Sequence, residues 1–252
     1  MLTASANADR IDAYPIINWP GDPIPNVNAS YSFHDDDQGW VGTIGVIHPD
    51  AAPSSIISIN AGYTGMNTSS FPFSNPGRVP GVYETTVTNG NTTLAWKVGD
   101  IPVVVSGDNI DLMYQLVDLV QPTETTSPRA GYQFRGPLPD GLTELETPYH
   151  RIAMRTPSLL TNDGSFGVAV EQGPLLNTLA GGGYTKLDTV TVNGLYGFKS
   201  ATGYPTIGLA LSTDETLYIY SQSLTMEQLT NLAENVTITD EASWRTSYEL
   251  TD

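Results

Sequence analysis

Carboxylates are the residues of this chain with the most potential for chemistry, because 27 Asp and Glu stand against only 10 Lys and Arg. Two neighbouring sets could supply the acid and the base of a glycoside hydrolase, namely Glu144 with Glu146 and Asp214 with Glu215. That reaction needs two carboxylates about 5–10 Å apart across a cleft. Asp214 and Glu215 fall in a predicted hairpin turn, and so many acids produce accidental pairs easily. We therefore expect solvated turn residues here and assign no catalytic residue.

The acidic run Asp35–Asp37 is the densest cluster of charge and could bind Ca²⁺, which takes about six to eight oxygen ligands in a flexible loop. The flanking β-type segments favour a solvated hairpin turn instead, and the distal Glu of a full calcium-binding loop is absent. The chain has no Cys, and its three histidines, His34, His48 and His150, lie far apart. We expect no metal ion and no cofactor.

Other catalytic motifs are missing from the sequence. It contains no Gly-x-Ser-x-Gly elbow, Ser-x-x-Lys pair or P-loop. Gly181–Gly183 follows a predicted helix, whereas a dinucleotide-binding loop opens one. The formal net charge of −17 argues against nucleic acids and anionic membrane surfaces, because cationic side chains bind their phosphates. These absences favour a protein that is not an enzyme.

Aromatic residues give a better indication of binding. Tyr218 and Tyr220 alternate with Ile219, so the two tyrosines share the opposite face of a predicted strand. The simpler interpretation is that this segment belongs to a core between a sheet and a helix. The alternative is that one face of the sheet lines a pocket for an apolar or sugar ligand.

An internal repeat indicates which elements position these residues. Segments 94–106 and 209–221 match at a constant offset of 115, which places Asp100 opposite Glu215 in the turn of each predicted hairpin. Residues 81–83 also match 194–196 at an offset of 113. Each copy therefore predicts antiparallel strands followed by a helix.

The predicted helices carry apolar residues at intervals of three and four. In the first copy these are Met113, Leu116, Val117 and Val120; in the second they are Met226, Leu229, Leu232, Ala233 and Val236. Aligning Met113 with Met226 gives an offset of 113, two less than that of the hairpins. Thr225 and Gln228 form a capping box for the second helix, and Asp108, Asn109 or Asp111 could cap the first.

Further elements complete the expected architecture. Strands are expected at 31–33, 40–47, 56–60, 150–155 and 165–170, and a short helix from Leu175. The Gly- and Ser-rich stretch 61–80 predicts a long loop, and the Pro-rich stretch 121–148 a junction. We predict an α+β protein, mainly antiparallel β-sheet, in two related halves: 1–128 and 129–252. Each half ends in a helix packed on its sheet.

Residues 192–236 combine a Val-Asn-Gly strand start, a hairpin and a closing segment, Leu-Thr-Met-Glu-Gln-Leu-Thr-Asn-Leu-Ala. This stretch resembles DUF4367-like modules, bacterial extracytoplasmic domains found on anti-sigma-factor-type membrane proteins and envelope lipoproteins. The copy at 81–120 matches more loosely, because its helix lacks the Glu and the Ala. The resemblance implies an exported β-sheet-plus-helix module without catalytic residues.

We expect the chain to be a non-enzymatic, extracytoplasmic sensor or ligand-binding portion of a bacterial cell-envelope protein. It would be secreted or face outward from a membrane anchor, with a small ligand or an envelope protein as its partner. Its few lysines among many Thr, Ser, Asn and Gly suit that setting. No run of about 18 apolar residues predicts a membrane span. The alternatives are a carbohydrate-active hydrolase that uses acidic loop residues, and a structural surface protein that acts through protein–protein contacts.

Overall fold

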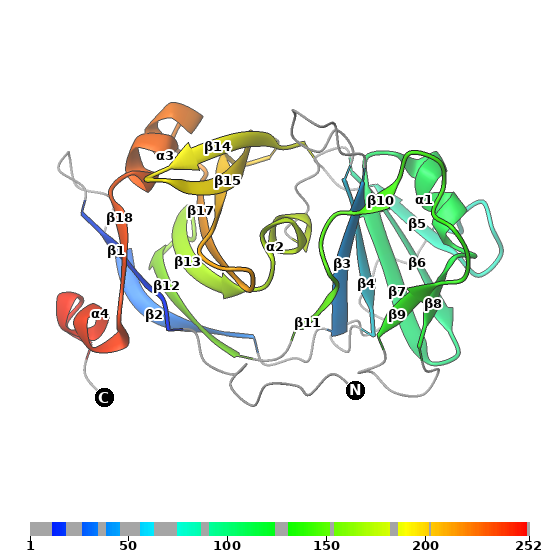
Figure 1. Cartoon of the computed structure of the whole chain (residues 1–252), viewed down its shortest axis with the longest axis horizontal. Helices are drawn as coiled ribbons and strands as arrows, with labels where there is room; N and C mark the ends of the chain where they lie inside the picture. Colours follow the sequence, from blue (N-terminus) through cyan, green and yellow to red (C-terminus); the bar gives the residue numbers. More distant parts are fainter. Residues whose placement is uncertain are drawn as a thin grey trace.

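Two antiparallel seven-stranded sheets face each other in the computed structural model, with one short helix between them (Figure 1). The structure describes residues 12–18, 27–34, 39–45, 56–62, 75–86, 91–123, 131–151, 154–181, 186–201 and 203–250. The first sheet has the order β10 (Thr143–Glu144), β3 (Gly39–Gly45), β4 (Ile56–Ala61), β7 (Ile101–Gly107), β6 (Thr92–Val98) and β5 (Tyr83–Thr86), and β11 (Tyr149–Arg151) also pairs with β3. The second has the order β14 (Asp188–Val192), β15 (Leu195–Ser200), β16 (Thr206–Ala210), β17 (Glu215–Ser221), β13 (Phe166–Gln172), β12 (Met154–Thr161) and β2 (Val27–His34).

The same unit occurs once in each sheet. The strand order β3-β4-β7-β6-β5 of the first sheet is repeated as β12-β13-β17-β16-β15 in the second. A helix follows in each case, α1 (Ile110–Leu116) or α3 (Met226–Ala233), and then a short strand, β8 (Val120–Pro122) or β18 (Val236–Thr239). The expected α+β class, with two related halves that each close with a helix on the sheet, is confirmed.

The alignment of the two helices by their methionines is wrong. Asn109 caps α1 and Thr225 caps α3, an offset of 116 (225 − 109). At this offset Met113 corresponds to Leu229, and both side chains are fully buried, whereas Met226 is only half-buried. A slip of three residues reproduces the spacing of an apolar stripe, so the identity of one methionine misled the alignment.

The constant offset of 115 through the hairpins is wrong as well. Leu94 pairs with Val105 across the first hairpin, but Leu209 pairs with Leu217 across the second. The first turn has Gly99 and Asp100 between the paired residues Val98 and Ile101, and the second turn is longer, running over 211–215. A single offset therefore cannot align both strands of the first hairpin with those of the second, because the two hairpins pair in different registers.

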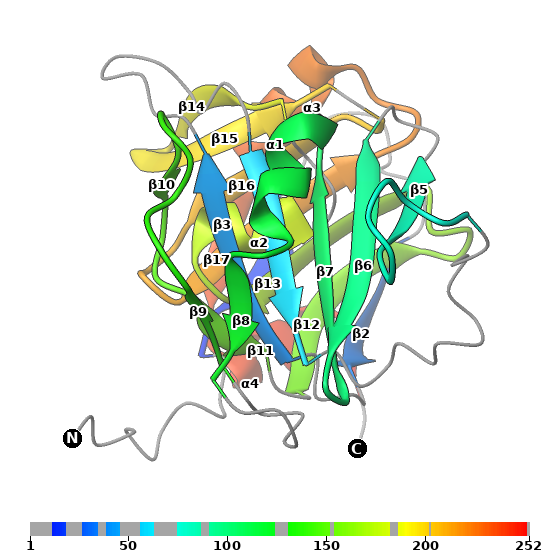
Figure 2. The ribbon, with the colours of Figure 1, turned by 90° about the vertical axis from the view of Figure 1, so that its right-hand side faces the viewer.

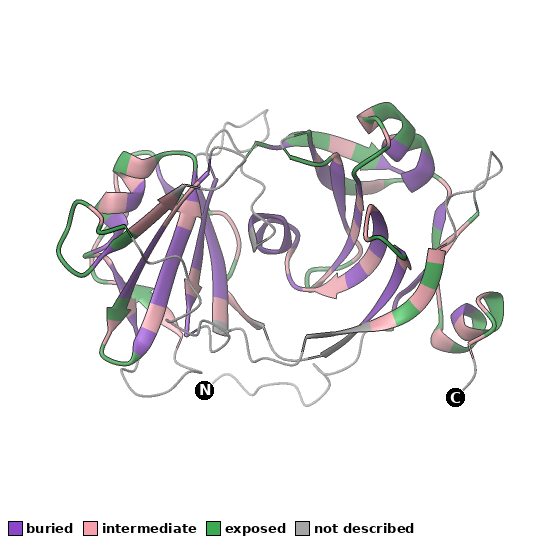
Figure 3. Cartoon of the chain, turned by 180° about the vertical axis from the view of Figure 1, so that it is seen from behind, coloured by how far each residue is buried: buried purple, intermediate pink, exposed green. Residues whose placement is uncertain are grey.

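The helices α1 and α3 lie on the outer sides of the two sheets, and the predicted apolar stripe of each helix faces its sheet. Figure 2 shows α1 in front of the first sheet, and Figure 3 shows buried residues along the strands of both sheets. The core under α1 includes Met113, Leu116, Val117 and Val120; the core under α3 includes Leu229, Leu232, Ala233 and Val236. Burial of these side chains supplies the main stabilisation of each half.

Strand pairing crosses the expected boundary at residue 128 in both directions, so from here on each half is defined by its sheet: β10 and β11 belong to the first half, and β2 belongs to the second. From the N-terminal side, β1 (Tyr14–Ile17) pairs with β18 and β2 pairs with β12. From the C-terminal side, β10 and β11 both pair with β3. The Pro-rich stretch expected to be a junction also contributes β9 (Tyr132–Phe134), which pairs with β8. The last helix, α4 (Glu241–Ser247), buries Trp244 against Tyr14 and Tyr31.

The helix between the sheets is α2 (Leu175–Gly181), which confirms the short helix expected at this position. It contacts β3 and β4 of the first sheet and β16 and β17 of the second. Gly208 gives it room, because a Cβ there would lie 3.0 Å from the side chains of Leu175 and Leu179. None of the helices that the structure describes is long and apolar enough to cross a membrane.

Candidate functional site

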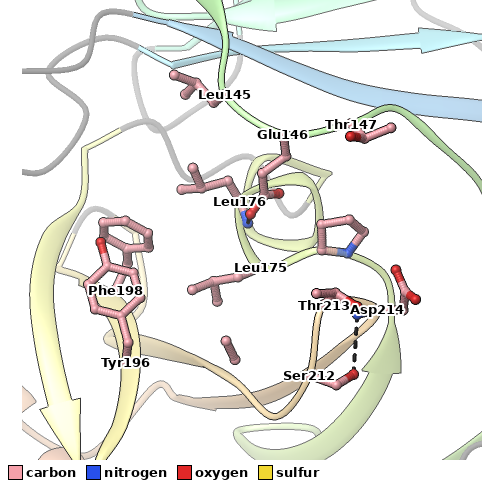
Figure 4. A pocket seen from close by; sticks show the side chains of 12 residues that line it. Leu145, Glu146, Thr147, Leu175, Leu176, Tyr196, Phe198, Ser212, Thr213 and Asp214 are labelled. Carbon is pink, nitrogen blue, oxygen red and sulfur yellow. Dashed lines mark hydrogen bonds between the residues drawn. The ribbon is translucent and has the colours of Figure 1, made fainter.

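A pocket of about 520 Å³ lies at the start of α2, and both halves of the molecule contribute to it (Figure 4). One wall comes from residues 145–147, between β10 and β11 of the first sheet. The opposite wall comes from β15, the end of β16 and the turn into β17. The lining residues are Leu145, Glu146, Thr147, Pro174, Leu175, Leu176, Tyr196, Phe198, Ala210, Ser212, Thr213 and Asp214.

The apolar part of the lining contains two aromatic rings. Tyr196 and Phe198 are two residues apart on β15, so their side chains lie on the same face of the strand. Their rings meet edge to face, with centroids 5.2 Å apart at 76°. Phe198 is buried together with Leu175 and Leu176, whereas Tyr196 is 53% exposed. Tyr196 therefore presents ring surface that a ligand can cover.

The carboxylate of Glu146 caps α2 from the other half of the molecule. Its Oε1 accepts the backbone N–H of Leu176 at 3.0 Å, and its Oε2 accepts that of Asn177 at 2.8 Å. The first N–H groups of a helix have no partner within the helix, so an acceptor from elsewhere stabilises its start. Burial raises the pKa of Glu146, and the two N–H donors, which lower it, offset only part of this effect.

Asn177 forms the second polar link between α2 and the first half. It is fully buried, its amide donates to the backbone oxygen of Thr147 at 3.1 Å, and its Oδ1 accepts the hydroxyl of Thr43 at 2.5 Å. On its other side α2 packs on the second sheet through leucines. The helix therefore joins the halves by these polar contacts to the first half and by an apolar cluster that contains Ile56 of the first sheet and Phe198 of the second.

The turn between β16 and β17 forms a polar rim, which is tied to the start of α2. The backbone N–H of Asp214 donates to Ser212 Oγ at 3.2 Å, and its backbone oxygen accepts the N–H of Gly173 at 2.7 Å. Gly173 has φ of 136°, and a Cβ at this position would lie 2.5 Å from the ring of Tyr149. Only glycine suits both conditions, so this residue sets the direction in which α2 begins.

The fold brings together one carboxylate from each pair that the sequence suggested. Glu146 and Asp214 line the same pocket, whereas Glu144 and Glu215 are not among its lining residues. Both oxygens of Glu146 accept backbone hydrogen bonds, so this carboxylate holds the helix in place. The expectation that Asp214 is a solvated turn residue agrees with its exposed position on the rim.

The aromatic pair that lines the pocket is not the pair that the sequence suggested. Tyr218 and Tyr220 lie with ring centroids 5.8 Å apart on β17, and Ile219 between them is buried in the core under α3. Tyr196 and Phe198 have the same alternation on β15, and that signal could have identified them. The alternation of aromatic residues occurs on both β15 and β17, so it does not show which of these strands lines the pocket.

Of the remaining candidates, His150 is described and is not among the residues that line the pocket. Asp35–Asp37 and His48 lie outside the described residues. His34 belongs to β2, and His150 belongs to β11, where its ring lies 5.6 Å from that of Trp40. Among the described residues, no group of three or more His, Asp or Glu side chains is placed to hold a metal ion.

A search of protein-family models, curated proteins and solved structures gives no match to this chain. The resemblance of 192–236 to DUF4367-like modules therefore stays a prediction.

Proposed function

We propose that this chain is the non-enzymatic, ligand-binding or sensor portion of an extracytoplasmic cell-envelope protein, and that its ligand binds in the pocket at α2. The observation that carries the proposal is the lining of the pocket, in which an aromatic and leucine surface faces a small polar rim across the interface of the two halves. Binding sites for small molecules are typically about 300–1,000 Å³ in volume, mostly apolar, with a few placed polar groups.

The position of the pocket suits a sensor. A ligand seated there contacts residues 145–147 of the first half and β15 and β16 of the second at once. Because α2 is held by both halves, a ligand that packs against its first turn stabilises the contact between them. Binding energy is thereby linked to the arrangement of the two halves.

Glycoside hydrolysis is the second candidate, favoured by one observation: Glu146, whose pKa is raised by burial, lines the same pocket as Asp214. A general acid must deliver its proton to the substrate. Both Glu146 oxygens already accept backbone N–H groups, so the geometry supports binding better than hydrolysis. Release of 4-nitrophenol from a panel of 4-nitrophenyl glycosides, lost in Glu146→Gln, would reverse this preference.

The binding proposal is tested with N-phenyl-1-naphthylamine, a neutral fluorescent probe whose emission rises in apolar surroundings. We expect saturable binding to the wild-type chain and about tenfold weaker binding to Tyr196→Ala, which corresponds to about 1.4 kcal/mol. Tyr204→Ala is the matched control, because Tyr204 is 50% exposed and lies outside the pocket. Absence of saturable binding, or equal weakening by both substitutions, would overturn the proposal.

The extracytoplasmic location is tested separately. Alkaline phosphatase fused to the C-terminus of the full-length protein is active in a bacterial host only after export of the fusion. We expect an active fusion. An inactive fusion at a normal expression level would contradict this part of the proposal.

A further inference from the structure

The charges around the pocket indicate what kind of ligand it takes, an inference that rests on the proposed function. Two of the twelve lining residues that the structure describes, Glu146 and Asp214, are acidic, and none of these twelve is Lys, Arg or His. The whole chain carries a formal net charge of −17. An anionic ligand would therefore meet repulsion both from the lining and from the protein as a whole.

Glu146 keeps the capacity to accept a further hydrogen bond. Each carboxylate oxygen has two acceptor positions, and each Glu146 oxygen uses one of them for an α2 backbone N–H. Glu146 and Tyr196 line the same pocket, and the pKa of Tyr196 is raised first by burial and then by the negative charge of Glu146.

Asp214 adds a second negative charge on the opposite rim (Figure 4). Its backbone N–H donates a hydrogen bond to Ser212 Oγ, and its backbone oxygen accepts one from the N–H of Gly173. The residue is exposed. The two carboxylates come from different halves of the molecule, so both act on a ligand only when it occupies the space between them.

The aromatic ring of Tyr196 complements these charges. A cation over the face of a tyrosine ring is attracted by the negative charge of the π system. Leu175, Leu176 and Ala210 supply apolar contact deeper in the pocket. We infer that the ligand is an organic ammonium compound with an apolar ring, in which the cation lies between the carboxylates and Tyr196 and the ring packs on the leucines.

The test compares three compounds of nearly equal size: benzylammonium, neutral benzyl alcohol and anionic benzoate. Their affinities are measured directly by saturation-transfer difference NMR, at one pH and one ionic strength. We expect benzylammonium to bind about tenfold more tightly than benzyl alcohol, and benzoate more weakly than either. Added salt should reduce the advantage of the cation, because it screens charges near the surface.

Asp214→Asn should reduce the preference for the cation, expressed as the ratio of the affinities for benzylammonium and benzyl alcohol, several-fold. Asp140→Asn removes the same charge from an exposed site outside the pocket and should leave the preference intact. Equal affinity for the three compounds, or equal effects of the two substitutions, would overturn the inference. The proposed function would still stand in that case if N-phenyl-1-naphthylamine binds in a Tyr196-dependent manner, and it fails on its own test if that probe does not bind.

Discussion

The two halves of the molecule share a repeated unit of five strands, called the frame below: β3, β4, β5, β6 and β7 in the first half, and β12, β13, β15, β16 and β17 in the second. They differ in the connection between the second and third strands of this frame, counted along the chain. In the first half, the end of this connection lies on the outside against α1: the Arg78 backbone N–H donates to Tyr114 Oη at 2.8 Å, and the Arg78 guanidinium lies 2.6 Å from Asp111. In the second half, the connection contains α2 and turns inward between the sheets. The repeated frame thus holds the molecule together, and the diverged connection builds the pocket.

The helices differ in a corresponding way. Asn109 and Thr225, the residues directly before α1 and α3, cap their own helices. The start of α2 is instead capped by Glu146, 30 residues away and on the other half. The frame helices can therefore form from local sequence and their own sheet, whereas the geometry of α2 depends on contact between the halves.

The largest expected effect comes from breaking the frame equally on both sides. Leu116→Ala and Leu232→Ala each remove a fully buried leucine at the same position of the repeated unit. We expect each to lower the free energy of unfolding by about 3 kcal/mol, through lost burial and a cavity. Urea denaturation followed by circular dichroism measures both losses. If one substitution cost less than about 1 kcal/mol, the two helices would not be equivalent in energy.

The strand exchange predicts that these two variants also unfold in a single transition. Because β2 pairs with β12 and β10 pairs with β3, neither residues 1–128 nor residues 129–252 can unfold without exposing a strand edge of the other segment. Fluorescence and circular dichroism should give coincident urea curves for both variants. Two separate transitions would contradict this coupling.

The next effect concerns the link that only α2 has. Glu146→Ala leaves two backbone N–H groups of the helix without their acceptor, and we expect a loss of about 1–2 kcal/mol at pH 7. The substitution should also weaken binding of N-phenyl-1-naphthylamine, because α2 forms part of the pocket. Unchanged stability and unchanged binding together would contradict the role of Glu146 in positioning α2.

Glu146 also predicts a pH dependence whose sign follows from its raised pKa. The native state binds this proton at a higher pH than the unfolded chain does, so this residue's stabilising contribution is fully present below the ordinary glutamate pKa. This protonation-linked part of its contribution is lost as the pH rises through the raised pKa, whereas the two backbone hydrogen bonds that Glu146→Ala removes are present at pH 7. Compared with Glu146→Gln, the wild-type chain should therefore gain stability as the pH falls from 7 towards 4.5. A stability difference that stays constant over this range would contradict the expectation.

A smaller effect is expected from the local caps of the frame helices. Asn109→Ala and Thr225→Ala each remove a side-chain acceptor for a backbone N–H, at Leu112 and Gln228 respectively. Each should cost about 1 kcal/mol, measured by urea denaturation. Neither should change affinity for the aromatic probe, since neither Asn109 nor Thr225 lines the pocket. A loss of probe binding in either variant would contradict the expectation that the frame helices do not shape the pocket.

The smallest effect is expected at the turn that joins β12 and β13. Asp163 accepts the backbone N–H of Ser165 at 3.0 Å and the hydroxyl of Thr161 at 2.8 Å, and these bonds lower its pKa to about 2. Its stabilisation is present above the ordinary pKa of 3.8 and is lost as the pH falls towards 2. Asp163→Asn should therefore have a slightly lower Tm than wild type at pH 6, and the difference should vanish near pH 2. A difference that persists at pH 2 would assign the effect to something other than the carboxylate.

Most of the frame could be predicted from the sequence, because it depends on local patterns. The apolar stripes of α1 and α3, the Thr225 cap and the short helix after Pro174 are all determined by spacing and by nearby residues. The exact correspondence between the copies could not be read, because a stripe shifted by three residues keeps its period and a turn one residue longer changes the register of a hairpin.

The pocket could not be predicted, because it depends on contacts between distant segments. The strands that bring Glu146 to α2 are two or three residues long and pair with β3, about 100 residues earlier in the chain. Strands this short carry no period of their own. The aromatic alternation at Tyr196 and Phe198 was present in the sequence, but only the tertiary pairing shows that this part of β15 faces the start of α2.

The measurement that tests the central claim most directly is a map of where small aromatic compounds bind. The deuterated, ¹⁵N-labelled chain is titrated in turn with benzyl alcohol and benzylammonium, and amide shifts are followed by transverse-relaxation-optimised NMR. The pocket at α2 predicts saturable shifts concentrated at residues 145–147, 175–177, 196–198 and 210–214, with α1 and its connection at 75–82 unaffected. Saturable shifts centred on α1 or on the outer face of α3, or no saturable shifts with either compound, would contradict it.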